Sequence, residues 1–316
     1  MPAVLYLGPS IPDLLALLSL ETERQALVEG LSPLSFCARQ ADMFSLRVEG
    51  TGQWLLESDQ FKSWLAADQS STLWCSGIPG AGKTVLAAIV IDHLQRVVVT
   101  SEGDDVGIAF AYLSHQERIQ QTPSNIMGSL LKQLVQDRPA LCDLLKPLFQ
   151  KRGGRNTILT LKDVSVALEH VIARHRKVFI VIDALDECPK HNGFRDVLLS
   201  ELGSLSRHVN LLVTSRSHIN IDFDIEGAAR LEIQASEADL RKYLWTRITR
   251  ANRPVRFVRP DDELKAKIVE TLLGNAQGMF LLAQLHMDLI ASSCLTYISF
   301  ETFASGARPT DELLDE

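Results

Sequence analysis

The stretch GIPGAGKTVL, residues 77–86, places three glycines and a proline directly before a lysine and a threonine. Glycine permits backbone dihedral angles that other side chains forbid, so such a loop can wrap its N–H groups around an anion. Lys83 supplies a flexible positive charge, and the Thr84 hydroxyl is placed to ligate Mg²⁺. Pro79 lacks an N–H and fixes one φ angle, which stiffens the loop. The stretch therefore predicts a phosphate-binding loop made of Gly77, Pro79, Gly80, Ala81, Gly82, Lys83 and Thr84.

The segments on both sides of this loop have the expected character. STLWCSG, residues 71–77, is a strand candidate, and residues 84–98 carry apolar side chains at helical spacing. A helix that begins at Lys83 directs the positive end of its dipole at the loop. An ordinary glycine-rich turn is the alternative, and the strand before and the helix after the loop disfavour it.

Strand and helix candidates alternate along most of the chain. The other strand candidates are residues 105–113, 177–185, 209–216 and 229–235, and the helix candidates between them are 123–137, 161–175 and 196–205. This alternation predicts an α/β fold, a P-loop NTPase with a five-stranded, mainly parallel sheet flanked by helices. Helix candidates at 12–30 and 57–67 precede the loop, and residues 31–53 are mixed and turn-rich.

Only helix candidates follow residue 236, over residues 236–248, 261–274 and 275–291. Ser236 and Asp239 fit the start of the first of them, as N-cap and first-turn acid. We expect a boundary near residue 236 and four parts: an N-terminal helix and linker (1–53), a nucleotide-binding domain (54–235), a small helical domain (236–292) and an irregular acidic tail (293–316).

Acidic residues end the most apolar strand candidate, in VFIVIDALDE, residues 178–187. In a sheet of this class an aspartate at that place, Asp183, lies beside the phosphate loop and holds Mg²⁺, and Asp186 or Glu187 can polarise a water for attack on the terminal phosphate. The alternative is a strand end capped by exposed acids.

The next strand candidate ends in Thr214, Ser215 and Arg216, and ligands bind at the carboxyl ends of parallel strands. Arg216 is therefore a candidate sensor of the terminal phosphate, with a plain surface arginine as the alternative. This layout implies one strand between the loop strand and the Asp183 strand. The sequence has no guanine-reading motif, which favours ATP or ADP over guanine nucleotides.

Composition is that of a soluble globular protein. No signal peptide or membrane span is indicated, which leaves the cytosol or the nucleus, and we expect a cytoplasmic protein. The 316 residues carry a net charge of −7, and 46% are apolar. The five cysteines are scattered, which favours free thiols, and no apolar run reaches the ~18 residues of a membrane span. Residues 241–259 hold seven lysines and arginines and no acid. A solvated basic face is favoured there, with contact to nucleic acid or to a neighbouring subunit as alternatives.

Five segments together resemble the NACHT branch of the STAND ATPases, most closely the nephrocystin-3-like N-terminal domain of fungal NOD-like receptor proteins. They are EGTGQWLLESDQFKSWL, TLWCSGIPGAGKT, VFIVIDALDEC, LLVTSRS and AQGMFLLAQLHMDLI. The resemblance implies a molecular switch that holds ADP at rest, exchanges it for ATP and then self-associates or recruits other signalling proteins. It assigns the loop to Gly77–Thr84, Mg²⁺ to Thr84 and Asp183, hydrolysis to Asp186 and Glu187, and sensing to Arg216. Gly278–Phe280 takes the place of a helical-domain motif near the nucleotide.

The sequence departs from this family after the helical segments. Proteins of this class continue with a winged helix and with repeats, and the last residues here match neither, so we expect a core that holds ADP loosely. Two functions stay open: a switch with slow Mg²⁺-dependent ATP hydrolysis, and a non-hydrolysing nucleotide-binding module that acts as a scaffold for self-association.

Overall fold

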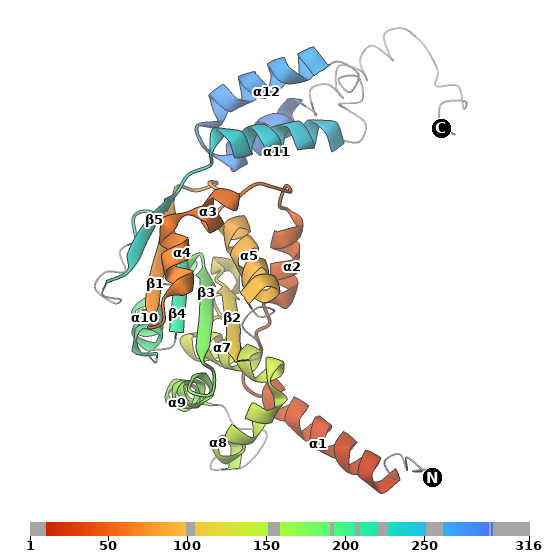
Figure 1. Cartoon of the computed structure of the whole chain (residues 1–316), viewed down its shortest axis with the longest axis vertical. Coiled ribbons are helices and arrows are strands. Elements are labelled where there is room, and N and C mark those ends of the chain that lie inside the picture. Colours follow the sequence, from red (N-terminus) through yellow and green to blue (C-terminus); the bar gives the residue numbers. More distant parts are fainter. Residues whose placement is uncertain are drawn as a thin grey trace, which may run out of the picture.

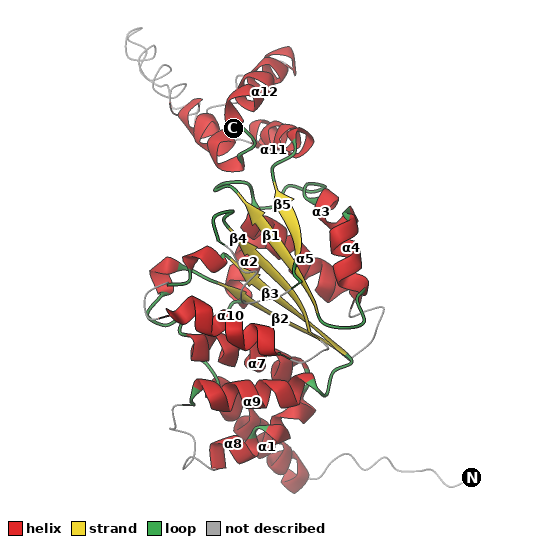
Figure 2. Ribbon diagram, turned by 90° about the vertical axis from the view of Figure 1, so that its left-hand side faces the viewer, coloured by secondary structure: helices red, strands yellow, loops and turns green. Residues whose placement is uncertain are grey.

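A computed structural model describes residues 11–98, 105–150, 159–189, 193–205, 209–219, 227–250, 262–290 and 292. A twisted sheet forms the centre, and helices cover both of its sides (Figure 2). α4 and α5 lie on one side of the sheet, and α7 and α10 lie on the other with α9 packed against α7. The C-terminal helices lie beyond one end of the strands (Figure 1).

The sheet has five strands in the order β2-β3-β4-β1-β5, and every neighbouring pair is parallel. The strands are β1 (Ser71–Gly77), β2 (Val106–Tyr112), β3 (Lys177–Asp183), β4 (Val209–Ser215) and β5 (Ala229–Ile233). β4 lies between β1 and β3, which confirms the expected extra strand and the P-loop NTPase fold. β2, β3 and β4 are buried along their whole length, and β3 has the apolar run predicted for a strand covered on both faces.

The helices of the α/β part confirm most of the predicted ones. They are α1 (Ile11–Glu29), α2 (Cys37–Ser45), α3 (Gln53–Glu57), α4 (Asp59–Ala66), α5 (Lys83–His93), α7 (Pro123–Asp137), α8 (Lys146–Gln150), α9 (Leu161–Ile172) and α10 (Phe194–Ser204). α5 continues as a π-helical turn, η1 (Leu94–Val98), and short 3₁₀ turns are η2 (His115–Glu117), η3 (Pro139–Leu144) and η4 (Leu185–Glu187). Side-chain caps fix several starts; Thr160 and Asp163 form a complete capping box at α9.

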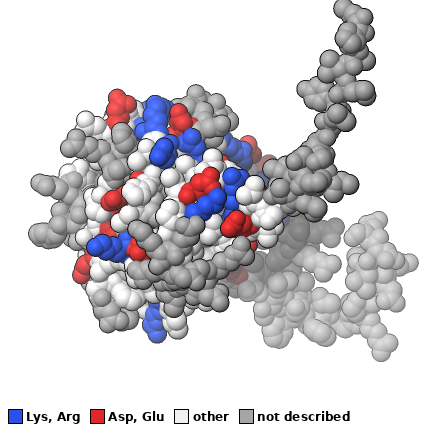
Figure 3. All heavy atoms as spheres, turned by 90° about the horizontal axis from the view of Figure 1, so that it is seen from below, with Lys and Arg blue, Asp and Glu red and all other residues white. Residues whose placement is uncertain are grey.

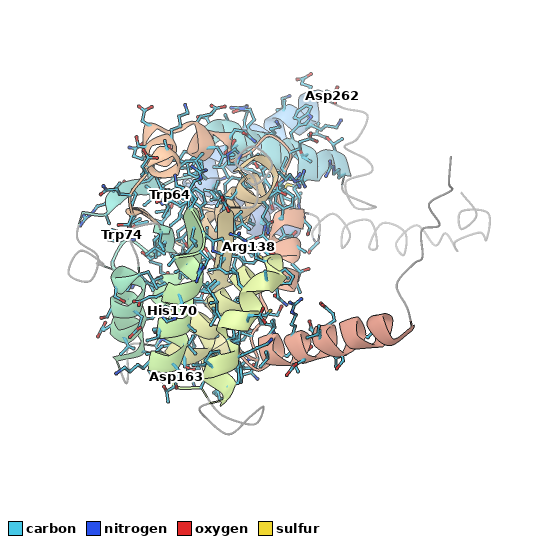
Figure 4. The ribbon with its side chains drawn as sticks, turned by 60° about the horizontal axis from the view of Figure 1, so that its bottom comes forward. Trp64, Trp74, Arg138, Asp163, His170 and Asp262 are labelled. Carbon is cyan, nitrogen blue, oxygen red and sulfur yellow. The ribbon has the colours of Figure 1, made fainter. Side chains whose placement is uncertain are left out.

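Aromatic packing attaches α4 to the sheet. The Trp64 ring lies 5.3 Å from that of Phe179 and 5.4 Å from that of Phe61, measured between ring centroids. Its Nε1 donates a hydrogen bond to the Leu211 carbonyl at 3.0 Å, so this buried polar atom is satisfied. Figure 4 labels Trp64 together with Trp74. Across the sheet, Trp74 Nε1 donates to Ser215 Oγ at 2.8 Å and joins β1 to β4.

A second, smaller core joins the C-terminal helices, α11 (Glu237–Arg250), α12 (Asp262–Ala276) and the helix over residues 280–290. Its buried members are Leu240, Leu244, Ile248, Val269, Leu272, Ala276, Ala283 and Met287. The division of the chain at residue 236 stays a prediction.

Two local predictions were wrong. The turn-rich interpretation of residues 31–53 missed α2, and α3 was not predicted either. The predicted helix over 275–291 is interrupted, because Gln277 and Gly278 both have left-handed φ angles, of 48° and 72°. Residues 293–316, the predicted tail, lie outside the described residues.

Surface charge is mixed on the face turned away from the C-terminal helices. Its lysines and arginines alternate with aspartates and glutamates in the described part (Figure 3). No described helix has the length and apolar character needed to cross a membrane.

Candidate functional site

The predicted phosphate loop joins the end of β1 to the start of α5. Gly80 and Gly82 have φ angles of 77° and 94°, in the left-handed region that favours glycine. The Ala81 N–H donates to the Ile78 carbonyl at 3.3 Å and closes the turn. Gly82 is the N-cap of α5, so the loop and the positive end of the helix dipole form one anion-binding surface.

Lys83 lies over this loop. Its Nζ donates hydrogen bonds to the carbonyls of Gly77 at 2.8 Å and Ile78 at 2.9 Å. Burial lowers the pKa of Lys83, and the nearby Asp186 and Asp183 oppose that shift. The ammonium group is therefore close to the two predicted acids, and a bound phosphate would replace its carbonyl partners.

Asp183 and Thr84 meet beside the loop. Asp183 is buried at the end of β3 and accepts hydrogen bonds from Thr214 Oγ1, at 2.6 Å, and from the Thr84 side chain. Burial raises the pKa of Asp183, and these hydrogen bonds oppose the rise. Thr214 Oγ1 also accepts the N–H of Ala184, whose φ of 58° is unusual for a non-glycine residue. A hydroxyl and a carboxylate are hard oxygen ligands and fit Mg²⁺ bound together with substrate phosphates.

Asp186 and Arg216 form a two-point contact between the segments that follow β3 and β4. Arg216 Nε lies 2.9 Å from Asp186 Oδ2, and the Arg216 N–H donates to Asp186 Oδ1 at 3.0 Å. The Asp186 side chain is only 8% exposed, whereas that of Arg216 is 49% exposed. The structure thus brings these two predicted site residues together as an ion pair.

Glu187 contacts the loop that follows β2. Its Oε2 accepts the N–H of His115 at 3.1 Å. Gln121 holds the same loop, because its side chain accepts the Ser114 N–H at 2.8 Å and donates to the Tyr112 carbonyl at 3.1 Å. Sequence reasoning missed this loop, since its polar residues resemble those of any surface turn.

Two adjacent pockets that share part of their lining contain most of these residues. A pocket of about 620 Å³ is lined by Arg39, Ser114, His115, Gln116, Asp186, Glu187, Arg216 and His218. A second pocket, lined in part by Thr84, Tyr112 and Asp183, shares four of these residues: Arg39, Ser114, Gln116 and Glu187. We call the two together the acid cleft. It extends from Thr84 and Asp183 at one end to Arg216 at the other, and Arg39, on the unpredicted helix α2, lines both parts.

The C-terminal helices reach the phosphate loop from the other side. The Leu281 N–H approaches the Gly80 carbonyl at 3.4 Å, and a Cβ added at Gly82 would lie 3.2 Å from the Phe280 ring. Farther out, the Gly52 N–H donates to Asp239 Oδ2 at 3.0 Å. Phe280, the last residue of the Gly278–Phe280 segment, thus lies next to the loop.

Part of the basic run of residues 241–259 lies on α11. Arg241 pairs there with Glu237 and Glu270, and Arg247 lies 3.7 Å from Asp288. These acids come from residues outside the run and compensate its charge locally. Residues 251–261 lie outside the described residues.

Comparisons with known proteins agree with the fold. Residues 50–216 match the model of the family described as nephrocystin 3, N-terminal. The vegetative incompatibility protein HET-E-1 of Podospora anserina is 25% identical over 247 residues, which cover 75% of this chain and 18% of that protein. The chain thus spans less than a fifth of the length of this relative.

Solved structures with a similar fold are more distant in sequence. The Aeropyrum pernix ORC1 protein in complex with DNA is 18% identical, with a TM-score of 0.45, over 78% of this chain and 64% of that one. Domain III of the Thermotoga maritima replication initiation protein DnaA is 12% identical, with a TM-score of 0.41, over 84% of this chain and 91% of that one.

Proposed function

Because the chain belongs to the nephrocystin 3 N-terminal family, we propose that it is a nucleotide-dependent switch that binds ATP or ADP with Mg²⁺ at the Gly77–Thr84 loop. The observation that carries the proposal is the meeting of Lys83, Thr84 and Asp183 at the end of a parallel sheet. The resemblance to NACHT-type switches supports a signalling role in which the nucleotide controls self-association. The similarity to HET-E-1, a vegetative incompatibility protein, agrees with that resemblance.

The loop supplies the binding energy for the phosphates. Its backbone N–H groups and the dipole of α5 attract the anion, and Lys83 exchanges its two carbonyl partners for phosphate oxygens. Thr84 and Asp183 would hold Mg²⁺, which neutralises phosphate charge when it is bound. In that state Asp183 is ionised, so binding of the ion overcomes the raised pKa of this buried carboxyl.

Slow hydrolysis of ATP is the finer part of the proposal. Asp186 already has both carboxylate oxygens engaged by Arg216. Glu187 has one oxygen bound to a backbone N–H and lines both parts of the acid cleft. We therefore assign the polarisation of the attacking water to Glu187, with the Asp186–Arg216 pair fixing the shape of the cleft beside it.

The first experiment measures binding of fluorescent ADP and ATPγS to the full chain in Mg²⁺. Lys83→Ala removes a charged donor, and charge-assisted hydrogen bonds are each worth about 1.5–3 kcal/mol. We expect at least about 100-fold weaker binding of both nucleotides. Lys62→Ala, which removes an exposed lysine on α4 away from the cleft, is the matched control and should bind as the wild type does. Equal binding by the Lys83 variant and the wild type would contradict the proposal.

A second experiment separates the switch from the non-hydrolysing scaffold. Glu187→Gln keeps the shape of the side chain and removes its basicity, so it should retain nucleotide binding and lose phosphate release. If the wild type releases phosphate no faster than Lys83→Ala, the scaffold is the better description. Size measurements with ADP and with ATPγS then show whether the nucleotide controls self-association.

A further inference from the structure

The acid cleft contains two arginines with different surroundings. The guanidinium group of Arg216 is neutralised by Asp186 at 2.9 Å. The guanidinium group of Arg39 makes neither a hydrogen bond nor an ion pair with any residue in the described part of the chain. Arg39 therefore brings a positive charge without a direct hydrogen-bond or ion-pair partner in the described residues to a cleft lined by Asp183, Asp186 and Glu187.

The side chain of Arg39 is exposed, but the helix that carries it is anchored beside the cleft. The neighbouring Gln40 is buried and donates a hydrogen bond to the Ala88 carbonyl of α5 at 3.0 Å. The Tyr112 hydroxyl, at the end of β2, donates a hydrogen bond to Oε1 of the same Gln40 amide group. Phe36, one turn before Gln40, is buried as well. Helix α2 is thus fixed both to the helix that follows the phosphate loop and to the sheet.

The charge of Arg39 acts on the wall of the cleft. Burial and the nearby Asp183 raise the pKa of Tyr112, and Arg39 opposes that shift. Arg39 and Glu187 line both pockets of the acid cleft, between the Thr84–Asp183 end and the Asp186–Arg216 end. A phosphate that extends past Thr84 into the cleft meets this arginine, and the planar guanidinium fork matches two phosphate oxygens.

We propose that Arg39 contacts the terminal phosphate of bound ATP and that it, rather than Arg216, makes the site distinguish ATP from ADP. The inference rests on the proposed function, because it needs a nucleotide at the Gly77–Thr84 loop. ADP has no third phosphate and leaves Arg39 without a partner. The contact also couples the presence of the third phosphate to helix α2, and so to the segment that precedes the nucleotide-binding fold.

The test compares the affinities of the full chain for fluorescent ATPγS and fluorescent ADP in Mg²⁺. Arg39→Ala should weaken ATPγS binding about tenfold or more and leave ADP binding within about twofold of the wild type. Arg39→Lys keeps a point charge without the fork and should recover part of the ATPγS affinity. The matched control is Arg47→Ala, which removes the same charge just beyond α2, where the guanidinium lies over the Phe44 ring outside the acid cleft.

The ADP affinity serves as the internal check on folding. The inference would be overturned if Arg39→Ala changed neither affinity, or if it weakened ATPγS and ADP binding by the same factor. Arg216→Ala with a larger selective loss of ATPγS than Arg39→Ala would overturn it too. A wild type that binds neither nucleotide, or a Lys83→Ala variant that binds both normally, refutes the proposed function itself and the inference with it.

Discussion

Asp183 shows most clearly how a single residue at the site affects stability. Its carboxyl group is fully buried, and burial raises its pKa above the ordinary value of 3.8 despite the hydrogen bonds from Thr214 and Thr84. The folded state therefore holds this proton more tightly than the unfolded state does. The free energy of unfolding is highest below the unfolded pKa and falls as the pH rises through the folded pKa. At neutral pH the group thus lowers the stability of the nucleotide-free protein.

Asp183→Asn should reverse this effect, because the amide has the same shape and no charge to bury. We expect the Tm of the nucleotide-free variant at pH 7 to exceed that of the wild type, by about 2–4 °C for each kcal/mol regained. The difference should shrink as the pH falls toward the unfolded-state pKa, because the folded wild type then regains the proton of this carboxyl. Mg²⁺ with ATPγS should raise the Tm of the wild type but not that of the variant.

The matched control for this substitution is Asp68→Asn, which removes an exposed aspartate between α4 and β1. Thermal melts of the three proteins at pH 4 and pH 7 check the prediction. A Tm at pH 7 below that of the wild type, without nucleotide, would show that the charge of Asp183 is compensated in the folded state.

Gly52 precedes α3 and determines how this helix packs against its neighbours. Its φ is 76°, and a Cβ added there would lie 2.7 Å from Leu86 Cδ2 and 2.9 Å from Ile89 Cδ1. Leu86 and Ile89 both belong to α5, the helix that follows the phosphate loop. Since its N–H also donates to Asp239, Gly52 joins α5 to the start of α11. This close approach gives the GTGQW motif a physical reason for its second glycine.

Gly52→Ala should therefore destabilise the protein through two effects, an unfavourable φ and a clash with α5. Gly227→Ala is a matched control, because Gly227 has the same φ of 76° and no atom within 4 Å of an added Cβ. We expect Gly52→Ala to cost about 1–3 kcal/mol more than Gly227→Ala, as forced overpacking does. Urea unfolding of both variants measures the difference, and equal midpoints would exclude the clash.

Elements differed in how well the sequence predicted them, for physical reasons. The apolar run of β3 and the apolar centre of β4 reflect parallel strands covered on both faces, so the sequence identified both strands to within two residues. Helix α2 was missed because its inward anchor is the polar Gln40, which breaks the apolar period. The position of Arg39 could not be predicted for the same reason.

The site was predictable where it depends on local order along the chain. The loop, Asp183 and the acids after it follow directly from strand ends, and the structure brings them together. The engagement of Asp186 by Arg216 depends on the geometry of two turns after neighbouring strands, which residue order does not specify. Their functional roles stay predictions until nucleotide binding is measured.

The C-terminal helices give the whole molecule a way to couple the loop to a second core. Phe280 and Leu281 begin the last described helix and lie against Gly82 and Gly80 of the loop. The Phe280 ring also packs edge-on against Tyr243 of α11, with 5.4 Å between the centroids. A shift of these helices relative to the sheet must therefore change the surface that the loop presents to a phosphate.

Phe280→Ala tests this coupling. Loss of the ring removes its contacts with Gly82 and Tyr243, and an aromatic pair contributes about 0.5–1.5 kcal/mol beyond the area it buries. We expect fluorescent ADP to dissociate about 3- to 10-fold faster from the variant in a stopped-flow chase with unlabelled ADP. Leu285→Ala, on the same helix with a side chain 54% exposed, should leave the rate unchanged. Equal dissociation rates in the wild type and the Phe280 variant would mean that ADP is held by the loop and the sheet alone. A slower rate in the variant would mean that the ring obstructs the loop, so that the C-terminal helices compete with the nucleotide for it.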